Sequence, residues 1–187
     1  MTVDVNVKDV RKAEDLKLWR LCQREKPIPT LTKGKVVLIG DAAHPMLPHQ
    51  GQGGGMAIED GAALGVLFSN LRSKDEIPER LALFENLRLD RVSAMQVFSS
   101  VGQDEAAKIT HLAQPYVKGS LPTTPEQYHD YNFTPNILRD AEEMLIHHLW
   151  TKSGQNNPHN GERGEEPLLD IVNVREGKED VGSSSES

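Results

Sequence analysis

The residues best suited to chemistry lie between Asp41 and Met56 of this 187-residue chain. A short apolar run, Val36–Ile39, precedes Asp41. Its lack of alternation predicts a strand covered on both faces of a mostly parallel sheet. Ligands of open α/β sheets lie outside the carboxyl ends of the strands, where Asp41 is expected. Because a lone carboxylate repels phosphate, it favours hydrogen bonds from ligand hydroxyl groups, such as those of a sugar chain.

A run of glycines leaves the backbone bare shortly after Asp41, at Gly51, Gly53, Gly54 and Gly55. A ligand can contact backbone that carries no side chains. From Met56 to Phe68 the apolar residues show helical spacing, so the glycines lie at or just before a helix N-terminus. Free N–H groups and the helix dipole favour an anionic or electron-rich group there. Pro45 and Pro48 stiffen the intervening turn.

This part of the chain contains Gly40-Asp41-Ala42-Ala43-His44-Pro45, Pro48, Gly51-Gln52-Gly53, Glu59-Asp60 and Leu64. The block resembles the second FAD-binding motif of the single-component flavoprotein monooxygenases, the family of aromatic-ring hydroxylases that includes salicylate and p-hydroxybenzoate hydroxylases. In such proteins the motif's aspartate, here Asp41, binds a ribityl hydroxyl of FAD. The resemblance places Pro48 near the flavin ring and the backbone of Gly53–Met56 at the pyrimidine end of the ring. The helix that begins there would stabilise negative charge on the reduced flavin.

The resemblance implies a set of cofactor-binding residues: Asp41, Pro48, Gly51, Gln52, Gly53, Gly54, Gly55 and Met56. It also implies FAD as the cofactor, NAD(P)H as the reductant, and a small aromatic substrate and O₂ as partners. The expected activity is that of a flavoprotein monooxygenase that hydroxylates an aromatic or related ring. No catalytic residue is assigned, because the base or anchor for the substrate belongs to sequence that this chain lacks.

The expected fold is an α-rich fragment of an α/β protein, namely a partial FAD-binding domain with a central strand, a glycine turn and following helices. The G-x-G-x-x-G sequence of an N-terminal Rossmann βαβ unit does not occur in the chain. Without that unit the central strand would expose an edge and an apolar face, so we expect the chain either to be marginally stable alone or to recruit a partner chain that supplies the missing half. The resemblance divides the chain into the end of a substrate-binding region (1–34), the C-terminal part of the FAD-binding domain with a helical extension (35–150) and a disordered acidic tail (151–187).

Apolar periodicity and proline positions predict the other elements. We expect a long helix from about Pro78 to Ser100, a short helix at Gln103–Ala113 and a helix at Asn136–Leu149. Prolines at 115, 122, 125 and 135 predict a loop between the last two helices. Asp15–Cys22 is expected to be a short helix or strand, and the alternating valines of residues 3–7 an edge strand or a frayed terminus.

Three polar residues near the glycines raise the question of a metal site. The spacing of Asp41, His44 and His49 matches no familiar set of metal ligands, so no metal is expected. His44 is expected to hold the turn. For His49 two interpretations stay open, a surface imidazole or a hydrogen-bond donor to flavin or substrate.

Two charged pairs have simpler explanations than catalysis. Glu59 and Asp60 follow the glycines and are interpreted as favourable charges near a helix N-terminus. Glu85 and Arg88 lie in the predicted long helix, where we expect them to be neighbours on its surface with a structural role.

Composition narrows the class of protein. The net charge of −7 argues against nucleic acid or an anionic membrane as a partner. The single cysteine, Cys22, excludes an internal disulfide and fits a reducing compartment, and no apolar run approaches the roughly 18 residues of a membrane span. These features predict a cytoplasmic protein. The missing pyrophosphate-binding motif favours one alternative function, a non-catalytic binding or assembly protein that keeps the fold.

Overall fold

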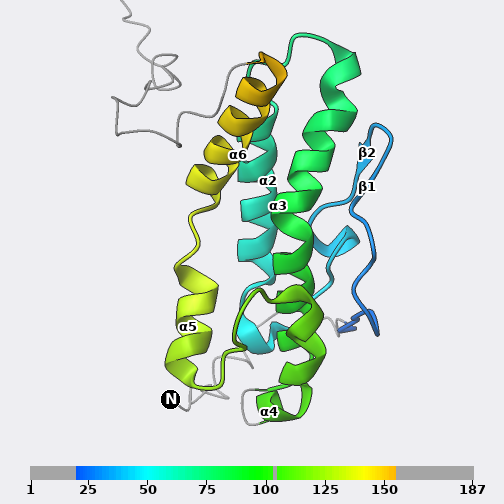
Figure 1. Cartoon of the computed structure of the whole chain (residues 1–187). Coiled ribbons are helices and arrows are strands. Elements are labelled where there is room, and N and C mark those ends of the chain that lie inside the picture. Colours follow the sequence, from blue (N-terminus) through cyan, green and yellow to red (C-terminus); the bar gives the residue numbers. More distant parts are fainter. Residues whose placement is uncertain (1–19, 103–104, 155–187) are drawn as a thin grey trace, which may run out of the picture. The chain divides into compact units, whose positions relative to one another are not determined.

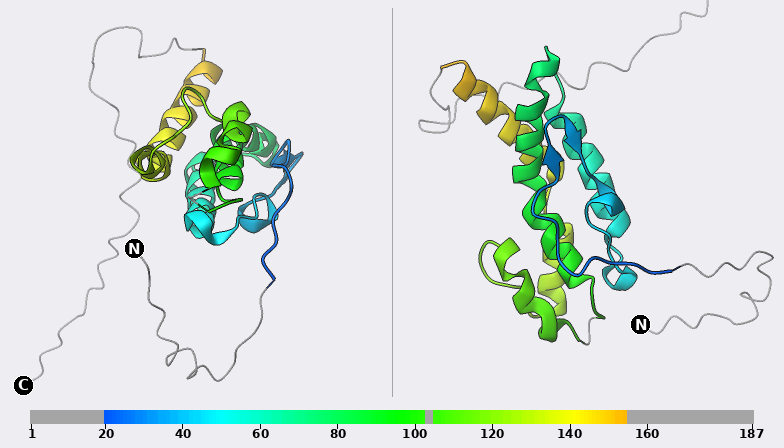
Figure 2. Two further views of the ribbon diagram at one scale, coloured as in Figure 1. Left: turned by 90° about the horizontal axis from the view of Figure 1, so that it is seen from below. Right: turned by 90° about the vertical axis from the view of Figure 1, so that its right-hand side faces the viewer.

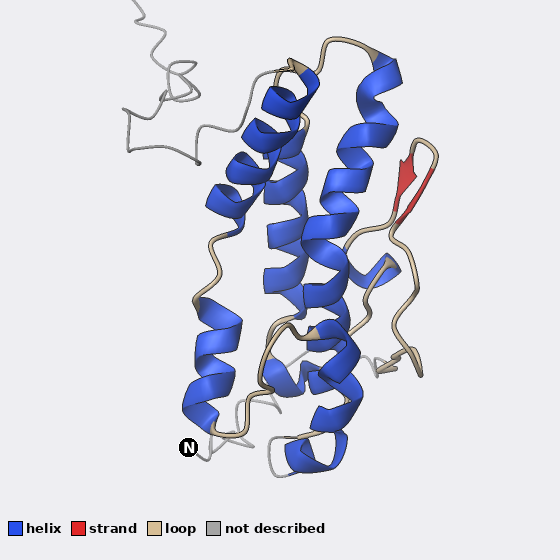
Figure 3. Cartoon of the chain, viewed as in Figure 1, coloured by secondary structure: helices blue, strands red, loops and turns tan. Residues whose placement is uncertain are grey.

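The computed structural model describes residues 20–102 and 105–154. Internal contacts divide the chain into a unit of residues 1–149 and a second unit of residues 150–187. Helices dominate the described residues, whose sheet is a single two-stranded hairpin (Figure 3). This confirms the α-rich character expected from the sequence.

The apolar run Val36–Ile39 does not form a strand of a parallel sheet in the described residues, so that prediction is wrong here. β1 (Thr32–Lys33) instead pairs with β2 (Val36–Val37) in antiparallel orientation. Gly34 adopts φ +62°, a left-handed conformation that glycine favours in such tight turns. The described residues offer β2 no parallel neighbour, so its backbone groups pair with the segment just before it in sequence.

The residues of β2 and those that follow it leave apolar side chains in solvent. Val36 is 63% exposed, Leu38 41% and Ile39 39%. This agrees with the expectation that an apolar face of this strand is left uncovered. The hairpin lies beside α3 (Ile77–Phe98), which β1 contacts (Figure 2).

Two adjacent helices, α2 (Gly53–Leu67) and α3, form the centre of the first unit (Figure 1). In the sequence, η3 (Lys74–Glu76) connects the two helices, and the Ser73 side chain caps its N-terminus. Buried apolar residues at spacings of three, four, seven or eight along each helix contribute to the core: Met56, Ala63, Leu67, Phe84, Val92, Met95 and Phe98. Both helices agree with the sequence predictions to within one turn.

The segment after α3 is more helical than predicted. α4 (Ala106–Ile109) and η5 (Thr110–Tyr116) cover most of the short helix expected at Gln103–Ala113. α6 (Ile137–Lys152) confirms the helix expected at Asn136–Leu149.

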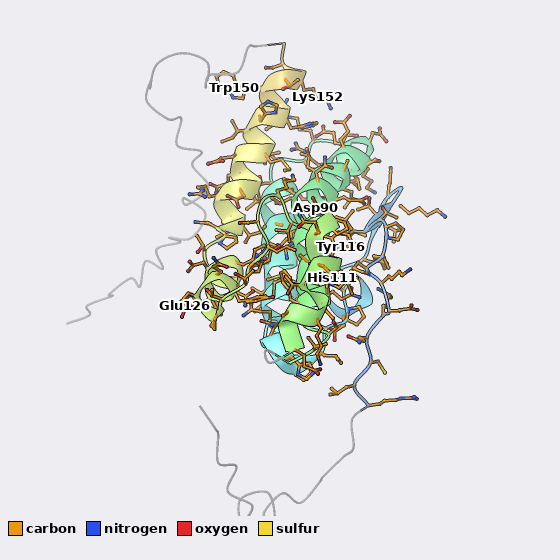
Figure 4. The ribbon with its side chains drawn as sticks, turned by 60° about the horizontal axis from the view of Figure 1, so that its bottom comes forward. Asp90, His111, Tyr116, Glu126, Trp150 and Lys152 are labelled. Atoms are coloured by element: carbon orange, nitrogen blue, oxygen red, sulfur yellow. The ribbon has the colours of Figure 1, made fainter. Side chains whose placement is uncertain are left out.

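The loop predicted across residues 115–135 is wrong in part, because it contains α5 (Pro125–Phe133). Pro125 occupies the first turn of this helix, where its missing N–H costs no hydrogen bond. The Thr124 hydroxyl accepts from the Gln127 N–H and so caps the helix. Glu126, labelled in Figure 4, adds a favourable negative charge to the first turn. A proline therefore does not always indicate a loop, since Pro125 starts a helix.

Several predictions concern residues outside those described: the valines of residues 3–7, most of Asp15–Cys22 and the acidic tail from residue 155 onward. Within the described ranges, no helix combines the length and apolarity needed to cross a membrane.

Candidate functional site

The turn from Gly40 to His44 presents Asp41 to solvent. It begins with η1 (Gly40–Ala42), and the His44 N–H donates to the Gly40 carbonyl at 2.8 Å. Gly40 adopts φ +54°, and a Cβ at this position would lie 3.4 Å from the Cβ of Ala57 on α2. Glycine therefore suits both the backbone conformation and the narrow space. The next residue, Asp41, is exposed.

One buried carboxylate, Asp60 of α2, fastens this turn to the helix. Its Oδ2 atom accepts from the Gly40 N–H at 3.0 Å and lies 2.7 Å from His44 Nε2. Asp60 is 1% exposed and His44 2%. Both ends of the turn are thus tied to the same oxygen atom, and His44 holds the turn as expected.

Arg24 binds the carbonyl groups in the middle of the turn. Its Nη1 atom donates to the Ala43 carbonyl at 2.6 Å and its Nη2 atom to the Ala42 carbonyl at 2.8 Å. The backbone of the turn is therefore held at both ends and in the middle. Its exposed carboxylate, on Asp41, is accessible from solvent.

Arg88 of α3 balances the charge of Asp60 and is fully buried. Its Nε atom donates to Asp60 Oδ1 at 2.8 Å, and its Nη2 atom donates to the Met56 carbonyl at 3.2 Å. Its Nη1 atom binds the Glu59 carboxylate, which also pairs with the guanidinium of Arg91. Two carboxylates and two guanidinium groups therefore join α2 to α3.

These contacts keep both carboxylates ionised. Burial by itself would raise the pKa of Asp60, but the hydrogen bonds from His44 and the Gly40 N–H and the charge of Arg88 outweigh it, so the pKa lies below its usual value. Burial also opposes ionisation of Glu59, yet Arg91 and Arg88 lower the pKa of that carboxyl overall.

Acidification is expected to destabilise the fold through Glu59 and Asp60. Their folded pKa values lie below the ordinary 4.5 and 3.8, so their stabilisation is present above those values and is lost as the pH falls through the folded ones. Urea unfolding followed by circular dichroism should give similar free energies at about pH 7 and pH 6 and a lower one near pH 3. An equal free energy of unfolding near pH 3 would contradict this linkage.

The interpretation of Glu59 and Asp60 as N-terminal helix charges is wrong. Both residues lie about two turns into α2, and the helix dipole acts mainly within the first turn. They bind the arginines of α3 instead. Their role is structural, but it depends on pairing between helices.

The expected surface pair of Glu85 and Arg88 is also wrong, because the two side chains serve different contacts. Arg88 is buried in the network with Asp60. The Glu85 carboxylate accepts from the Thr30 and Thr32 hydroxyls at 2.8 and 2.5 Å, and so fastens the start of β1 and the residues just before it to α3. A structural role holds for both residues.

The sequence of α3 contained a signal for the buried arginine. Arg88 lies four residues from both Phe84 and Val92, and all three are buried on one stripe of the helix. A charged residue within an apolar stripe needs a counter-charge, because an unpaired buried charge is very costly. The acidic pair on α2 supplies it.

The glycine run forms the entry and the first turn of α2, close to its predicted position. η2 (Pro48–Gln50) leads to Gly51 at φ +62°, and the buried Gln52 is the N-cap residue. Gly54 is exposed, and a Cβ there would meet no atom within 4 Å. The first-turn N–H groups of a helix, here those of Gly53–Gly55, lack partners within it and can donate to a ligand.

Met56 differs from the glycines before it. Its N–H donates to the Gln52 carbonyl at 2.8 Å, and its side chain is fully buried. Of the predicted cofactor-binding residues, Asp41 thus lies on the turn and Pro48–Gly55 at the entry to α2. Both groups are anchored on the same helix, whereas the Met56 side chain belongs to the core.

A metal centre is not evident in the described part of the chain, where no three His, Cys, Asp or Glu side chains form a cluster able to hold an ion. His44 is committed to Asp60. His49 is exposed on η2, and both interpretations of it stay open.

Comparison with known proteins gives consistent matches. Residues 8–99 match the family described as FAD binding domain. The chain is 44% identical over 136 residues to an FAD-dependent monooxygenase of Diaporthe leptostromiformis, a match that covers 73% of this chain and 37% of that protein. An FAD-dependent monooxygenase of Aspergillus candidus is 34% identical over 139 residues, with coverage of 74% and 32%. The 6-hydroxynicotinate 3-monooxygenase of Bordetella bronchiseptica is 38% identical over 87 residues, with coverage of 46% and 22%. The chain thus spans 37% and 32% of the length of the first two of these relatives.

Proposed function

Because the chain belongs to the FAD-dependent monooxygenase family, we propose that residues 40–55 hold the flavin half of FAD. One observation carries the proposal. An exposed carboxylate, Asp41, and the exposed first turn of α2 are fixed to one helix, the former through the bond from Gly40 to Asp60. The Asp41 carboxylate can accept hydrogen bonds from hydroxyl groups, and the first turn of α2 offers N–H donors at a fixed distance from it. This arrangement suits a ligand with a polyol chain and an electron-rich ring.

The roles of the residues follow from their chemistry. Asp41 accepts hydrogen bonds from the ribityl hydroxyls, and Pro48 packs by the ring. The N–H groups of Gly53–Gly55 face the pyrimidine edge, where the helix dipole favours negative charge. Gly51 and Gln52 set the direction in which the helix begins. The open space at Gly54 fits this arrangement, because no side chain separates the ligand from the backbone.

The proposed activity of the whole protein is hydroxylation of an aromatic or related ring with NAD(P)H and O₂. FAD, when bound, supplies the redox chemistry, and the described residues orient it and stabilise its charge. The similarity to a protein named 6-hydroxynicotinate 3-monooxygenase supports a small aromatic substrate. Residues 35–150 are proposed as the FAD-binding part of this chain, and a cytoplasmic location belongs to the same proposal.

Replacing Asp41 with alanine is expected to weaken FAD binding by about 10- to 100-fold, the effect of losing a charged hydrogen-bond acceptor. Titration of FAD into the purified chain, followed by quenching of flavin fluorescence, measures this affinity. The helix content, measured by circular dichroism, should stay unchanged because Asp41 is exposed.

The matched control is Asp130→Ala, which removes an exposed carboxylate on α5 far along the chain. It should leave the affinity within about twofold of the unaltered chain. An Asp41→Ala variant that binds FAD normally, or that loses helix content in parallel with affinity, would argue against the ribityl contact.

A second candidate function, non-catalytic binding or assembly, is favoured by the exposed apolar side chains of Val36, Leu38 and Ile39. Contiguous exposed apolar surface marks interaction sites. Purification of the chain in the presence of added FAD separates the two functions. A chain that retains no flavin at high FAD concentration, yet associates with a partner chain, would favour this second function.

A further inference from the structure

We propose that Asp60 is a positioning residue for flavin binding, which holds Asp41 in place through Gly40 and His44. The inference rests on the proposed function and adds a residue that the cofactor cannot reach. At 1% exposure, Asp60 cannot touch a ligand itself. Any effect it has on binding must pass through the groups that it fastens, which are the turn and Arg88 of α3.

The two oxygen atoms of Asp60 have separate partners. Oδ2 accepts from the Gly40 N–H and faces His44 Nε2, so it holds both ends of the turn. Oδ1 accepts from Arg88 Nε and serves the packing of α2 on α3. The positioning role therefore belongs to one oxygen and can be altered separately from the contact between the helices.

Among the described residues, the one side-chain hydrogen bond of His44 is to the Asp60 carboxylate. Its Nε2 atom lies 2.7 Å from Asp60 Oδ2, while its buried Nδ1 atom has no hydrogen-bond partner. Because Asp60 is ionised and can only accept, the proton of a neutral His44 must reside on Nε2. The ring thus donates one hydrogen bond, and its effect is to fix the far end of the turn.

Geometry explains why the turn matters for Asp41. The Gly40 N–H immediately precedes Asp41, and the His44 N–H returns to the Gly40 carbonyl, so the bonds close a small loop around Asp41. If Oδ2 no longer accepts, the Ile39–Gly40 peptide loses this anchor, and the Asp41 carboxylate that follows it samples a wider range of directions. Pre-organisation of this kind strengthens binding by reducing the entropy lost when the ligand binds.

Comparing the binding of two flavins distinguishes a role in positioning Asp41 from a general effect on the stability of the chain. Riboflavin carries the ribityl chain, whereas lumiflavin has a methyl group in its place, and neither needs an adenosine site. In the full chain, Asp60→Asn and His44→Phe should each weaken riboflavin binding, by about tenfold and fivefold, and change lumiflavin binding by less than about twofold. His44→Phe leaves the pair of Asp60 and Arg88 intact, so it stays informative if Asp60→Asn fails to fold.

Two controls complete the test. His111→Phe makes the same change at an exposed histidine of η5 (Figure 4) and should alter neither affinity. Combining His44→Phe with Asp41→Ala should weaken riboflavin binding no further than Asp41→Ala alone, because the positioning acts through Asp41.

Equal losses for riboflavin and lumiflavin, or additive losses in the combined variant, would overturn the positioning role while leaving flavin binding intact. If the unaltered chain binds neither flavin, the proposed function fails, and the inference fails with it. Selective, non-additive loss of riboflavin binding supports the role.

Discussion

Replacement of Arg88 by methionine is expected to lower the free energy of unfolding by about 3–5 kcal/mol, the usual cost of removing one partner from a buried ion pair. Methionine fills part of the space of the arginine stem but leaves Asp60 without its guanidinium, and Glu59 keeps only Arg91. Since small domains are stable by about 5–15 kcal/mol, the variant should be close to unfolding. Urea unfolding monitored by circular dichroism measures the loss.

Arg139→Met is the matched control for this experiment. Arg139 is exposed on α6 and pairs with Asp140 and Glu143, so its removal should cost about 0.5 kcal/mol or less. Similar losses for the two variants would mean that burial of Arg88 contributes nothing beyond a surface pair. Combining Arg88→Met with Asp60→Asn should recover part of the stability, because neither partner then leaves a buried charge alone.

Gly54→Glu should abolish flavin binding while stabilising the chain, which makes it the sharpest test of the site. The new side chain meets no atom within 4 Å in the structure, so it does not strain the fold. Helix propensity gains roughly 0.5–1 kcal/mol when glycine is replaced, and a negative charge in the first turn adds about 0.3–1 kcal/mol. The same carboxylate occupies the space and the N–H groups proposed for the flavin. The affinity for FAD should therefore fall by about 100-fold or more.

The control is Gly61→Glu, which makes the same change on the same helix. Gly61 is exposed, its Cβ would also meet no atom within 4 Å, and it lies two turns beyond the glycine run. It should leave the FAD affinity nearly unchanged. If Gly54→Glu binds FAD as well as the unaltered chain, the first turn of α2 does not face the flavin. A lower melting temperature for Gly54→Glu would show instead that Gly54 is needed for folding.

Local patterns predicted the elements that carry the site. The glycine run followed by apolar residues at helical spacing indicated the start of α2, and the periodicity of residues 78–100 indicated α3. Such patterns succeed because a helix buries one stripe of its own side chains, which the spacing reveals. A polar turn that carries Asp41 was likewise expected from its place after an apolar run.

Patterns failed where the decisive partner lies far away in sequence. The apolar run of Val36–Ile39 reads as a buried strand, yet its pairing depends on which other strands are present, and the described residues supply only β1. The helix α5 was missed for a local reason, since the proline that starts it is also a frequent residue of loops.

The sequence by itself determined which backbone is left bare at a helix N-terminus, which carboxylate precedes it, and the family to which that motif belongs. Only the tertiary structure decided that Asp60, 20 residues beyond Gly40 and 28 before Arg88, fastens the turn and joins the helices. Charge alone did not distinguish this aspartate from a surface residue. Its role follows from burial, because a carboxylate removed from water must bind partners that folding brings to it from distant parts of the chain.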